Sequence, residues 1–311
     1  MARVAAIDIG TNTVLLLVAE RGASGLLVPL VERATVTRLG ENVDKTRRLS
    51  PEAITRTVAC LEDYAREVAR LGGVDRVGVV GTSAMRDASG GEELRARVRT
   101  LFAVEPEVLS GEREARMAFR GSIAGLESLE GADLAVFDIG GGSTEVVLGR
   151  THREGAEIAF ASSFDLGSVR LTERLVSHDP VTQAEMDALL GAARSTFASV
   201  PPLGPVVTPI GTAGTMTTLA AVALRLTPYD GARVHGHVLR MEDVRTVVTE
   251  LAAMPAEVRR SVAGMEPKRA DVIVAGGCIA LALLEHWGAA SVRVSDRGVR
   301  WGLAEELAQN A

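Results

Sequence analysis

The sequence is poor in cysteine and has no long apolar run. Only Cys60 and Cys278 occur in 311 residues, and both fall inside apolar patterns with helical spacing. A disulfide framework is therefore not expected, and we predict two buried, inert thiols in a reducing compartment. No apolar stretch could span a bilayer, and the N-terminus enters a strand pattern without a basic segment and an apolar segment ahead of it. These absences predict a cytoplasmic protein with no membrane partner.

The chain also lacks aromatic residues and an excess of positive charge. Its formal net charge is −6 and aromatic residues make up 3% of it, so it has neither the positive field nor the stacking platforms of a general nucleic-acid binder. An anionic substrate would have to be held by backbone N–H groups and by local basic residues. Two groups of basic residues are candidates for that role: Arg33, Arg38, Lys45, Arg47 and Arg48, and further on Arg170, Arg174, Lys268 and Arg269.

One motif is present twice, separated by a domain-sized stretch of chain. The two copies are Asp8-Ile-Gly-Thr-Asn-Thr13 and Asp138-Ile-Gly-Gly-Gly-Ser-Thr144. In each copy an apolar run ends in the aspartate, and the chain passes through glycine and hydroxyl residues into a second apolar run. This pattern predicts a strand, a tight turn and a second strand.

The composition of these turns suits a phosphate. Glycine allows backbone N–H groups to converge on an anion, and Ser and Thr add hydroxyl donors. The aspartate would repel phosphate unless a cation such as Mg2+ lies between them. An ordinary hairpin with a capping aspartate would explain either turn alone. Because the turn is repeated at domain-scale separation, we expect two such turns to face each other across a metal-phosphate cleft.

The order of predicted elements restarts near residue 134, which indicates two domains. With 47% hydrophobic residues the chain is long enough for two cores. A strand meander followed by alternating strands and helices predicts an α/β fold in which each domain has a mixed sheet. We expect two duplicated ribonuclease-H-like domains, residues 1–128 and 129–311, with a boundary near 127–132 and a final helix, about 299–311, that packs back on the first domain. The main expected helices are 50–72, 92–101, 167–175, 182–198, 270–287 (interrupted at Gly276-Gly277) and 299–309, and the expected strands include 26–39, 76–81, 206–210 and 292–295.

A third Gly/Thr-rich stretch begins at Gly211, between a predicted strand and a predicted helix. Gly211, Thr212, Gly214 and Thr215 could bind an anion at the helix N-terminus. They could equally form a tight helix start that packs against the sheet, and the residues alone leave both interpretations open.

The histidines do not predict a metal site. His235 and His237 are expected on one side of a strand, but no Cys, His or acidic partner at metal-ligand spacing accompanies them. His178-Asp179 resembles the dipeptide of metal-dependent HD phosphohydrolases, but the other ligands are missing and Pro180 follows. We expect a loop there, leading into the helix at Thr182.

Taken in order, the motifs resemble those of the exopolyphosphatase and guanosine pentaphosphate phosphohydrolase (Ppx/GppA) family. The resemblance covers nearly the whole chain. Any single motif is moderately specific, because the actin, sugar-kinase and heat-shock ATPase superfold shares the two Asp-Gly turns. The six motifs are Asp8-Ile-Gly-Thr-Asn-Thr13, Gly81-Thr-Ser-Ala-Met-Arg86, Ser110-Gly-Glu-Arg-Glu114-Ala-Arg116, Asp138-Ile-Gly-Gly-Gly-Ser-Thr-Glu145, Gly211-Thr-Ala-Gly-Thr215 and Ser295-Asp-Arg-Gly298.

The resemblance implies Mg2+-dependent hydrolysis, with Mn2+ as an alternative cation, of the terminal phosphoanhydride of inorganic polyphosphate. Glu114 would be the general base toward water, Glu145 would orient that water, and Asp138 with Asp8 would hold the metal. Positioning and charge neutralisation are what phosphoryl transfer requires of a protein. The implied phosphate-binding residues are Thr11, Asn12, Thr13, Ser83, Arg86, Gly141, Gly142, Ser143, Thr144, Gly211, Thr212, Gly214 and Thr215.

Three alternatives stay open at this point. The nearest is removal of the 5′ terminal phosphate of guanosine pentaphosphate, which would use the same motifs. A kinase of the same superfold, or an actin-like protein that uses nucleotide as a switch, would need an adenosine site. The chain resembles the short, two-domain members of the family, for which we expect a preference for short polyphosphate, and a homodimer is common among such relatives.

Overall fold

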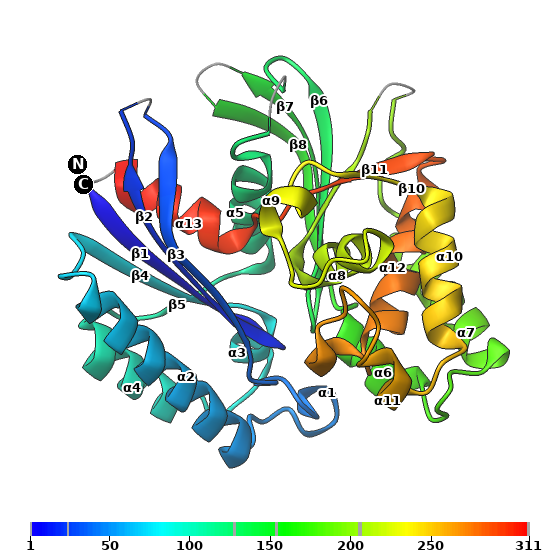
Figure 1. Ribbon diagram of the computed structural model, residues 1–311, viewed down its shortest axis with the longest axis horizontal. Coiled ribbons are helices and arrows are strands. Elements are labelled where there is room, and N and C mark those ends of the chain that lie inside the picture. Colours follow the sequence, from blue (N-terminus) through cyan, green and yellow to red (C-terminus); the bar gives the residue numbers. More distant parts are fainter. Residues whose placement is uncertain (1, 24, 127–128, 153–154, 205–206, 310–311) are drawn as a thin grey trace. The chain divides into compact units, whose positions relative to one another are not determined.

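The computed structural model describes residues 2–23, 25–126, 129–152, 155–204 and 207–309, and the chain divides into two compact units (Figure 1). Unit 1 comprises Met1–Gly125 and Gly298–Ala311, and unit 2 comprises Leu126–Arg297. Parts of three expected features lie outside the described residues: Glu127 and Ser128 of the expected boundary, Val206 of an expected strand, and Asn310 and Ala311 of the final segment.

The sheet of unit 1 has five strands in the order β3-β2-β1-β4-β5. The central strand β1 pairs antiparallel with β2 and parallel with β4, so the sheet is mixed. Side chains of a strand alternate between the two faces, and here both faces are covered: Ala5, Ile7 and Ile9 of β1 belong to one core cluster, and Val4 and Ala6 belong to another. The strands are β1 (Arg3–Ile9), β2 (Thr13–Arg21), β3 (Leu27–Val36), β4 (Arg76–Gly81) and β5 (Glu107–Val108).

Helices lie on both faces of this sheet (Figure 1). Helix α2 begins where Ser50 accepts a hydrogen bond from the Ala53 N–H, as the Ser-Pro signal predicts. On the opposite face α5 and α13 cross closely, because a Cβ on Gly121 or on Gly302 would overlap the backbone of the other segment. The helices are α1 (Val43–Thr46), α2 (Pro51–Arg70), α3 (Ser83–Asp87), α4 (Glu92–Phe102), α5 (Gly111–Ile123) and α13 (Val299–Gln309).

The sheet of unit 2 has six strands in the order β10-β11-β9-β6-β7-β8. Its central strand β6 pairs antiparallel with β7 and parallel with β9, which repeats the arrangement around β1. The common pairing reflects the repeated motif, because each Asp-Gly turn connects the same two antiparallel strands. The strands are β6 (Asp133–Ile139), β7 (Thr144–His152), β8 (Gly155–Phe164), β9 (Ile210–Thr212), β10 (Val238–Arg240) and β11 (Ser291–Val294).

The helices of unit 2 pack on one large apolar cluster that includes Phe137 of β6 and Leu281 of α12. Helix α7 begins with a capping box in which Thr182 and Glu185 bond each other's backbone N–H groups. The helices are α6 (Ser168–Leu175), α7 (Gln183–Phe197), α8 (Ala213–Ala223), α9 (Gly231–Val234), α10 (Met241–Ala252), α11 (Ala256–Arg259) and α12 (Ile273–His286), with a 3-10 turn at Pro267–Arg269.

Three local predictions are wrong. One is the strand expected over 206–210, since within the described residues only Ile210 of that range lies in a strand, at the start of β9. Helix α12 runs without a break through Gly276 and Gly277. A Cβ on Gly277 would overlap Val248 of α10. The glycine therefore allows α12 and α10 to pack closely and does not interrupt the helix. His235 and His237 do not lie on a strand, since Gly236 takes a φ of +83° and β10 begins only at Val238.

The predicted α/β class with two mixed sheets is confirmed. The two cysteines are buried, and burial raises the pKa of the Cys278 thiol to about 12, so that it stays protonated and unreactive. Over the described ranges, every helix is too short or too polar to cross a membrane.

Candidate active site

The two Asp-Gly turns have the same backbone geometry. In unit 1 the Gly10 N–H donates to the Thr13 carbonyl at 3.1 Å, and in unit 2 the Gly140 N–H donates to the Ser143 carbonyl at 3.0 Å. Asp8 and Asp138 precede these turns at the ends of central strands, and both are buried. The repeat in the sequence is therefore a repeat in structure, with a buried carboxylate before each turn.

The carbonyl groups of the first turn are held by the segment that follows β3. The Gly40 N–H donates to the Thr11 carbonyl at 2.8 Å, and the N–H groups of Thr37 and Arg38 both donate to the Asn12 carbonyl at 3.0 Å. Because the C=O and N–H of a trans peptide point in opposite directions, anchoring these carbonyls turns the following N–H groups away from the anchoring segment. Such a row of N–H groups suits an anion.

The second turn is held in the same way by the N-terminus of α6. Ser168 and Val169 donate backbone N–H groups to the carbonyls of Gly140 and Gly141, both at 2.9 Å. The buried side chain of Arg170 donates its Nε–H to the Gly142 carbonyl at 2.7 Å. Arg170, which the sequence offered as a substrate-binding residue, is thus bonded to the turn itself.

A row of polar side chains crosses the sheet of unit 2 beside this turn. Glu145 of β7 lies directly opposite Asp138 of β6, and opposite Ser163 of β8 on its other side. The Ser163 hydroxyl donates to Glu145 Oε1 at 2.6 Å. Directly opposed residues project from the same face of a sheet, so the two acidic side chains are neighbours.

The equivalent position in unit 1 is different. Leu15 lies opposite Asp8 in the β1–β2 pair, where Glu145 lies opposite Asp138 in unit 2. The two turns share their backbone, but only the second has a pair of carboxylates. The repeat is therefore chemically asymmetric.

Glu114 and Arg86 form an ion pair in unit 1. Arg86 of α3 donates to Glu114 Oε2 at 2.7 Å and to the Leu109 carbonyl at 3.0 Å. Glu114 lies in the first turn of α5, which Ser110 caps by accepting from the Arg113 N–H. Glu114 is 6% exposed, and both the guanidinium and the helix N-terminus stabilise its negative charge.

The third Gly/Thr stretch uses its hydroxyl groups inside the protein. Thr212 Oγ1 donates toward the carbonyls of Ser295 and Arg297, and Thr215 Oγ1 donates to the Ile139 carbonyl. A Cβ on Gly214 would overlap the guanidinium of Arg269. The stretch is a tight helix start, as one of the two interpretations has it, and it also brings a basic side chain against the N-terminus of α8.

Two other hydroxyl groups of the predicted phosphate set also donate to protein acceptors. Ser83 bonds the Asp87 carboxylate at 3.1 Å, and Thr144 bonds the Leu166 carbonyl. A hydroxyl has one proton to donate, so backbone N–H groups are the better donors at these positions. Asn12 differs, because its buried Nδ2 has no hydrogen-bond partner among the residues that the structure describes.

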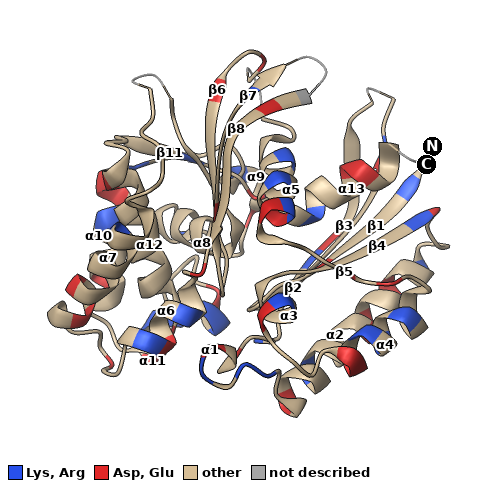
Figure 2. Cartoon of the chain, turned by 180° about the vertical axis from the view of Figure 1, so that it is seen from behind, with Lys and Arg blue, Asp and Glu red and all other residues tan. Residues whose placement is uncertain are grey.

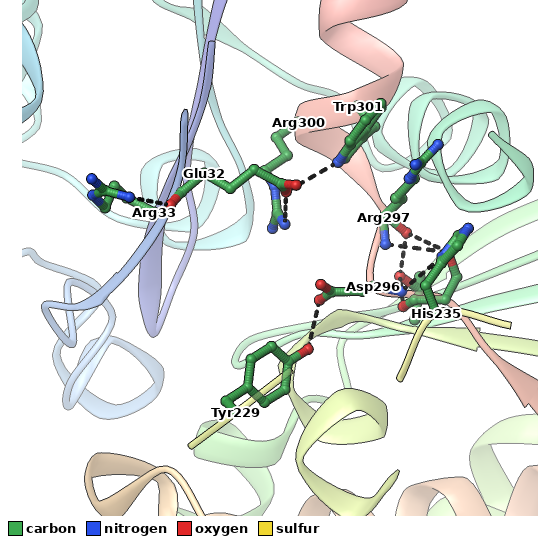
Figure 3. Close-up of polar contacts among 10 residues, drawn as sticks. Glu32, Arg33, Tyr229, His235, Asp296, Arg297, Arg300 and Trp301 are labelled. Atoms are coloured by element: carbon green, nitrogen blue, oxygen red, sulfur yellow. Dashed lines mark hydrogen bonds and ion pairs between the residues drawn. The ribbon is translucent and has the colours of Figure 1, made fainter. Parts of the chain in front are cut away.

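The last motif, Ser295–Gly298, contains the point where the chain leaves unit 2 and re-enters unit 1, and the residues before and after that point make hydrogen bonds within their own units (Figure 3). Tyr229 donates to Asp296 Oδ1 at 2.8 Å, and His235 Nδ1 lies 3.4 Å from the Ser295 hydroxyl and from the Asp296 N–H. After Gly298, in unit 1, Arg300 and Trp301 both donate to Glu32.

The acidic residues fit a cation whose coordination is completed by the substrate. No group of three or more His, Cys, Asp or Glu side chains within the described ranges could by itself hold a metal ion. Mg2+ commonly binds one or two carboxylates together with substrate phosphates and waters, and so needs no larger group. The neighbouring carboxylates of Asp138 and Glu145 repel each other, and a bound cation would offset this repulsion. The donor set therefore fits Mg2+.

Comparisons with known proteins agree with one another. Residues 17–311 match the model of the Ppx/GppA phosphatase family. Exopolyphosphatase 2 of Mycobacterium tuberculosis is 39% identical to this chain over 323 residues, covering 99% of both chains. The crystal structure of the Aquifex aeolicus Ppx/GppA family member superposes with a TM-score of 0.82 at 34% identity, covering 99% of this chain and 98% of that one. An exopolyphosphatase-like protein of known structure has a TM-score of 0.91 at 32% identity, covering 99% of both chains.

Proposed function

Because the chain belongs to the Ppx/GppA phosphatase family, we propose that it is an exopolyphosphatase. It hydrolyses the terminal phosphoric anhydride of inorganic polyphosphate and releases orthophosphate. The 39% identity to an exopolyphosphatase over full length supports this substrate. The main support for this chemistry is the ion pair between Glu114 and Arg86. The buried Glu114 carboxylate is bonded to Arg86 at 2.7 Å, which combines a proton acceptor with a cation that can bind phosphate.

Glu114 accepts a proton from the water that attacks the terminal phosphorus. In phosphoryl transfer a carboxylate needs only to align the water and take its proton. Glu145, whose orientation is set by the hydrogen bond from Ser163, orients the same water. The acceptor of the phosphoryl group is water, and so neither an acceptor sugar nor an adenosine site is required.

The oxygens of the terminal phosphates are bound by N–H groups and by arginine. The turn at Thr11–Thr13 supplies backbone N–H groups and the Asn12 amide, and the turn at Gly141–Thr144 supplies N–H groups directed by the anchored carbonyls. Arg86 and Arg269 add the charge of guanidinium groups. We count the backbone rather than the hydroxyls of Ser83, Thr144, Thr212 and Thr215 as the donors, because these hydroxyls already donate within the protein.

Phosphatases of this family are typically metal-dependent, and we propose Mg2+, with Mn2+ as a substitute. Asp138, together with Asp8, would hold it, and the bound cation would neutralise negative charge on the phosphate oxygens. Two predictions remain. The preference for short chains is tested by a series of polyphosphate lengths, and the homodimer is tested by light scattering.

The second candidate is removal of the 5′ phosphate of guanosine pentaphosphate, the other activity in the family name. The test is phosphate release with Mg2+ from polyphosphate of defined lengths, guanosine pentaphosphate and ATP at equal phosphate concentration. We expect the highest kcat/KM for polyphosphate. Faster release from guanosine pentaphosphate would assign the second function, and phosphate transfer that requires ATP and an acceptor would identify a kinase instead.

A further inference from the structure

Residues 37–48, between β3 and α2, form a segment that we call the basic loop. It contains the four basic residues Arg38, Lys45, Arg47 and Arg48 and the two acidic residues Glu41 and Asp44, a net charge of +2 in a chain of net charge −6. Figure 2 shows Lys and Arg residues gathered along the segment beside α1. The loop is thus locally positive in a negative protein.

The basic loop is bonded to two phosphate-binding elements of unit 1. At one end its backbone holds the first Asp-Gly turn, through the bonds from Thr37, Arg38 and Gly40 to the turn carbonyls. At the other end Arg47 and Ser89 are joined, since the Ser89 N–H donates to the Arg47 carbonyl at 2.9 Å. Ser89 follows α3, the helix that carries Arg86. The loop is therefore continuous with the proposed substrate site.

Two buried polar atoms at the first of these junctions have no hydrogen-bond partner within the described part of the chain. They are Nδ2 of Asn12 and Oγ1 of Thr37, and both residues are at most 5% exposed. Leaving a buried polar group unpaired is unfavourable, because the group loses its bonds to water and gains no partner in return. Two such groups on residues joined by a backbone hydrogen bond point to a ligand that would satisfy them.

The backbone of the basic loop is strained in the same region. Arg38, Asn42 and Arg47 have φ values of 54°, 58° and 53°, in the left-handed region that residues other than glycine rarely adopt. Such strain persists where surrounding contacts impose it, and it gathers at ligand clamps. In this loop the side chains of Lys45, Arg47 and Arg48 are exposed, while Glu41 is paired with Arg56 at 2.9 Å.

We propose that the basic loop is a second phosphate subsite, which binds the internal phosphates of a polyphosphate chain whose terminal phosphate lies at the first Asp-Gly turn. The inference rests on the proposed function and deepens it. A linear polyanion offers repeated charges to Lys45, Arg47 and Arg48, and Thr37, beside Asn12 of the first turn, binds the phosphate next to the end. Residues 37–48 contain no aromatic side chain on which a base could stack, which favours polyphosphate over a nucleotide.

The first test is the triple variant K45Q/R47Q/R48Q, compared with R95Q/R97Q/R99Q, which removes the same charge from α4. We expect the ratio of kcat/KM for a long chain to that for tripolyphosphate to fall about tenfold in the loop variant, as three exposed ion pairs allow, and to keep its wild-type value in the α4 variant. An equal loss at all chain lengths, or no loss, overturns the proposal.

Direct binding separates this inference from the proposed function. Titration calorimetry with polyphosphate over a series of salt concentrations needs no turnover. The slope of log affinity against log salt should become shallower by about 2 in the loop variant, since each contact to a single-stranded polyanion contributes about 0.7. If the wild type binds polyphosphate but releases no phosphate, the proposed function fails and the subsite stands. If both proteins show the same slope, the subsite fails.

The second variant is Thr37→Val, which removes the unpaired hydroxyl at nearly constant size. Without ligand its Tm should equal or exceed that of the wild type, because no hydrogen bond is lost. Its affinity for polyphosphate should fall several-fold. A lower Tm with unchanged affinity would show that the hydroxyl is structural and would overturn the assignment of Thr37.

Discussion

Arg86 donates a hydrogen bond to Glu114 at 2.7 Å, and the same side chain is held by the Leu109 carbonyl at 3.0 Å. The residue proposed to bind phosphate is therefore bonded to the residue proposed to take the proton. A substrate phosphate would share the guanidinium with Glu114, because the several N–H donors of arginine can serve both acceptors at once. Placement of the substrate and alignment of the base are thus coupled through one side chain.

Substitution Arg86→Lys tests this coupling. The ammonium keeps the charge but cannot bond Glu114, Leu109 and phosphate with the fixed fork of arginine. We expect kcat/KM to fall about 10- to 100-fold, with a lower kcat as well as a higher KM, in steady-state phosphate release. Arg116→Lys, which changes an exposed arginine of α5 paired with Glu112, is the control. A higher KM with unchanged kcat would restrict Arg86 to binding.

Asp138→Asn should weaken the response to Mg2+. The amide removes one charge from the Asp138–Glu145 pair, so the cation is attracted less strongly. We expect a Mg2+ titration of activity to shift to at least about tenfold higher concentration, with a lower rate at saturation. Asp133→Asn, at the exposed start of the same strand, should leave the titration unchanged. An unshifted curve for Asp138→Asn would remove this residue from the metal site.

Gly167→Ala should damage the second Asp-Gly turn. A Cβ at this position would overlap the backbone of Gly141 and Gly142, which must then move. We expect the KM for polyphosphate to rise at temperatures well below the Tm of the variant, where loss of stability cannot account for the change. Gly191→Ala is the matched control, because a Cβ there meets nothing within 4 Å. Gly191 lies inside α7, where alanine stabilises the helix by about 1 kcal/mol relative to glycine. Equal kinetics in both variants would contradict a role for the α6 contact in shaping the turn.

Glu306→Gln should cost stability in a pH-dependent way. Two hydrogen bonds from Arg113 hold the pKa of Glu306 below its ordinary value, although burial acts in the opposite direction. A lowered folded-state pKa adds stability that is complete above the unfolded value of about 4.3 and is lost as pH falls through the folded value. Urea unfolding should therefore show a loss of about 1 kcal/mol at pH 7, discounted for solvent screening, and a smaller loss at pH 3. A difference independent of pH would exclude the ion pair as the cause.

The local parts of the site could be predicted from the sequence. The two Asp-Gly turns depend on neighbouring residues, and glycine, hydroxyl and aspartate occupy fixed places in a strand-turn-strand pattern. The start of α2 at Ser50-Pro51 is equally local. These features need no knowledge of packing, and the structure confirms the strands and helices that they predicted.

The contacts that complete the site could not be predicted, because they depend on register and packing. Ser163 meets Glu145 only through the β7–β8 register, which shifts at Leu148/Gly149. Arg170 was among the basic residues considered for the substrate, and its bond to Gly142 depends on how α6 packs. The predicted break in α12 was wrong for a related reason: close packing at Gly277 outweighs the low helix propensity of glycine.

In the proposed function, Glu114 activates water for hydrolysis of the terminal anhydride. The most direct measurement is orthophosphate release from saturating polyphosphate and Mg2+ by Glu114→Gln beside the wild type, with polyphosphate binding measured on both proteins. Glutamine keeps the size of the side chain but cannot take the proton. We expect a rate at least about 100-fold lower with binding that is retained. A variant that binds polyphosphate and releases phosphate at the wild-type rate would contradict it.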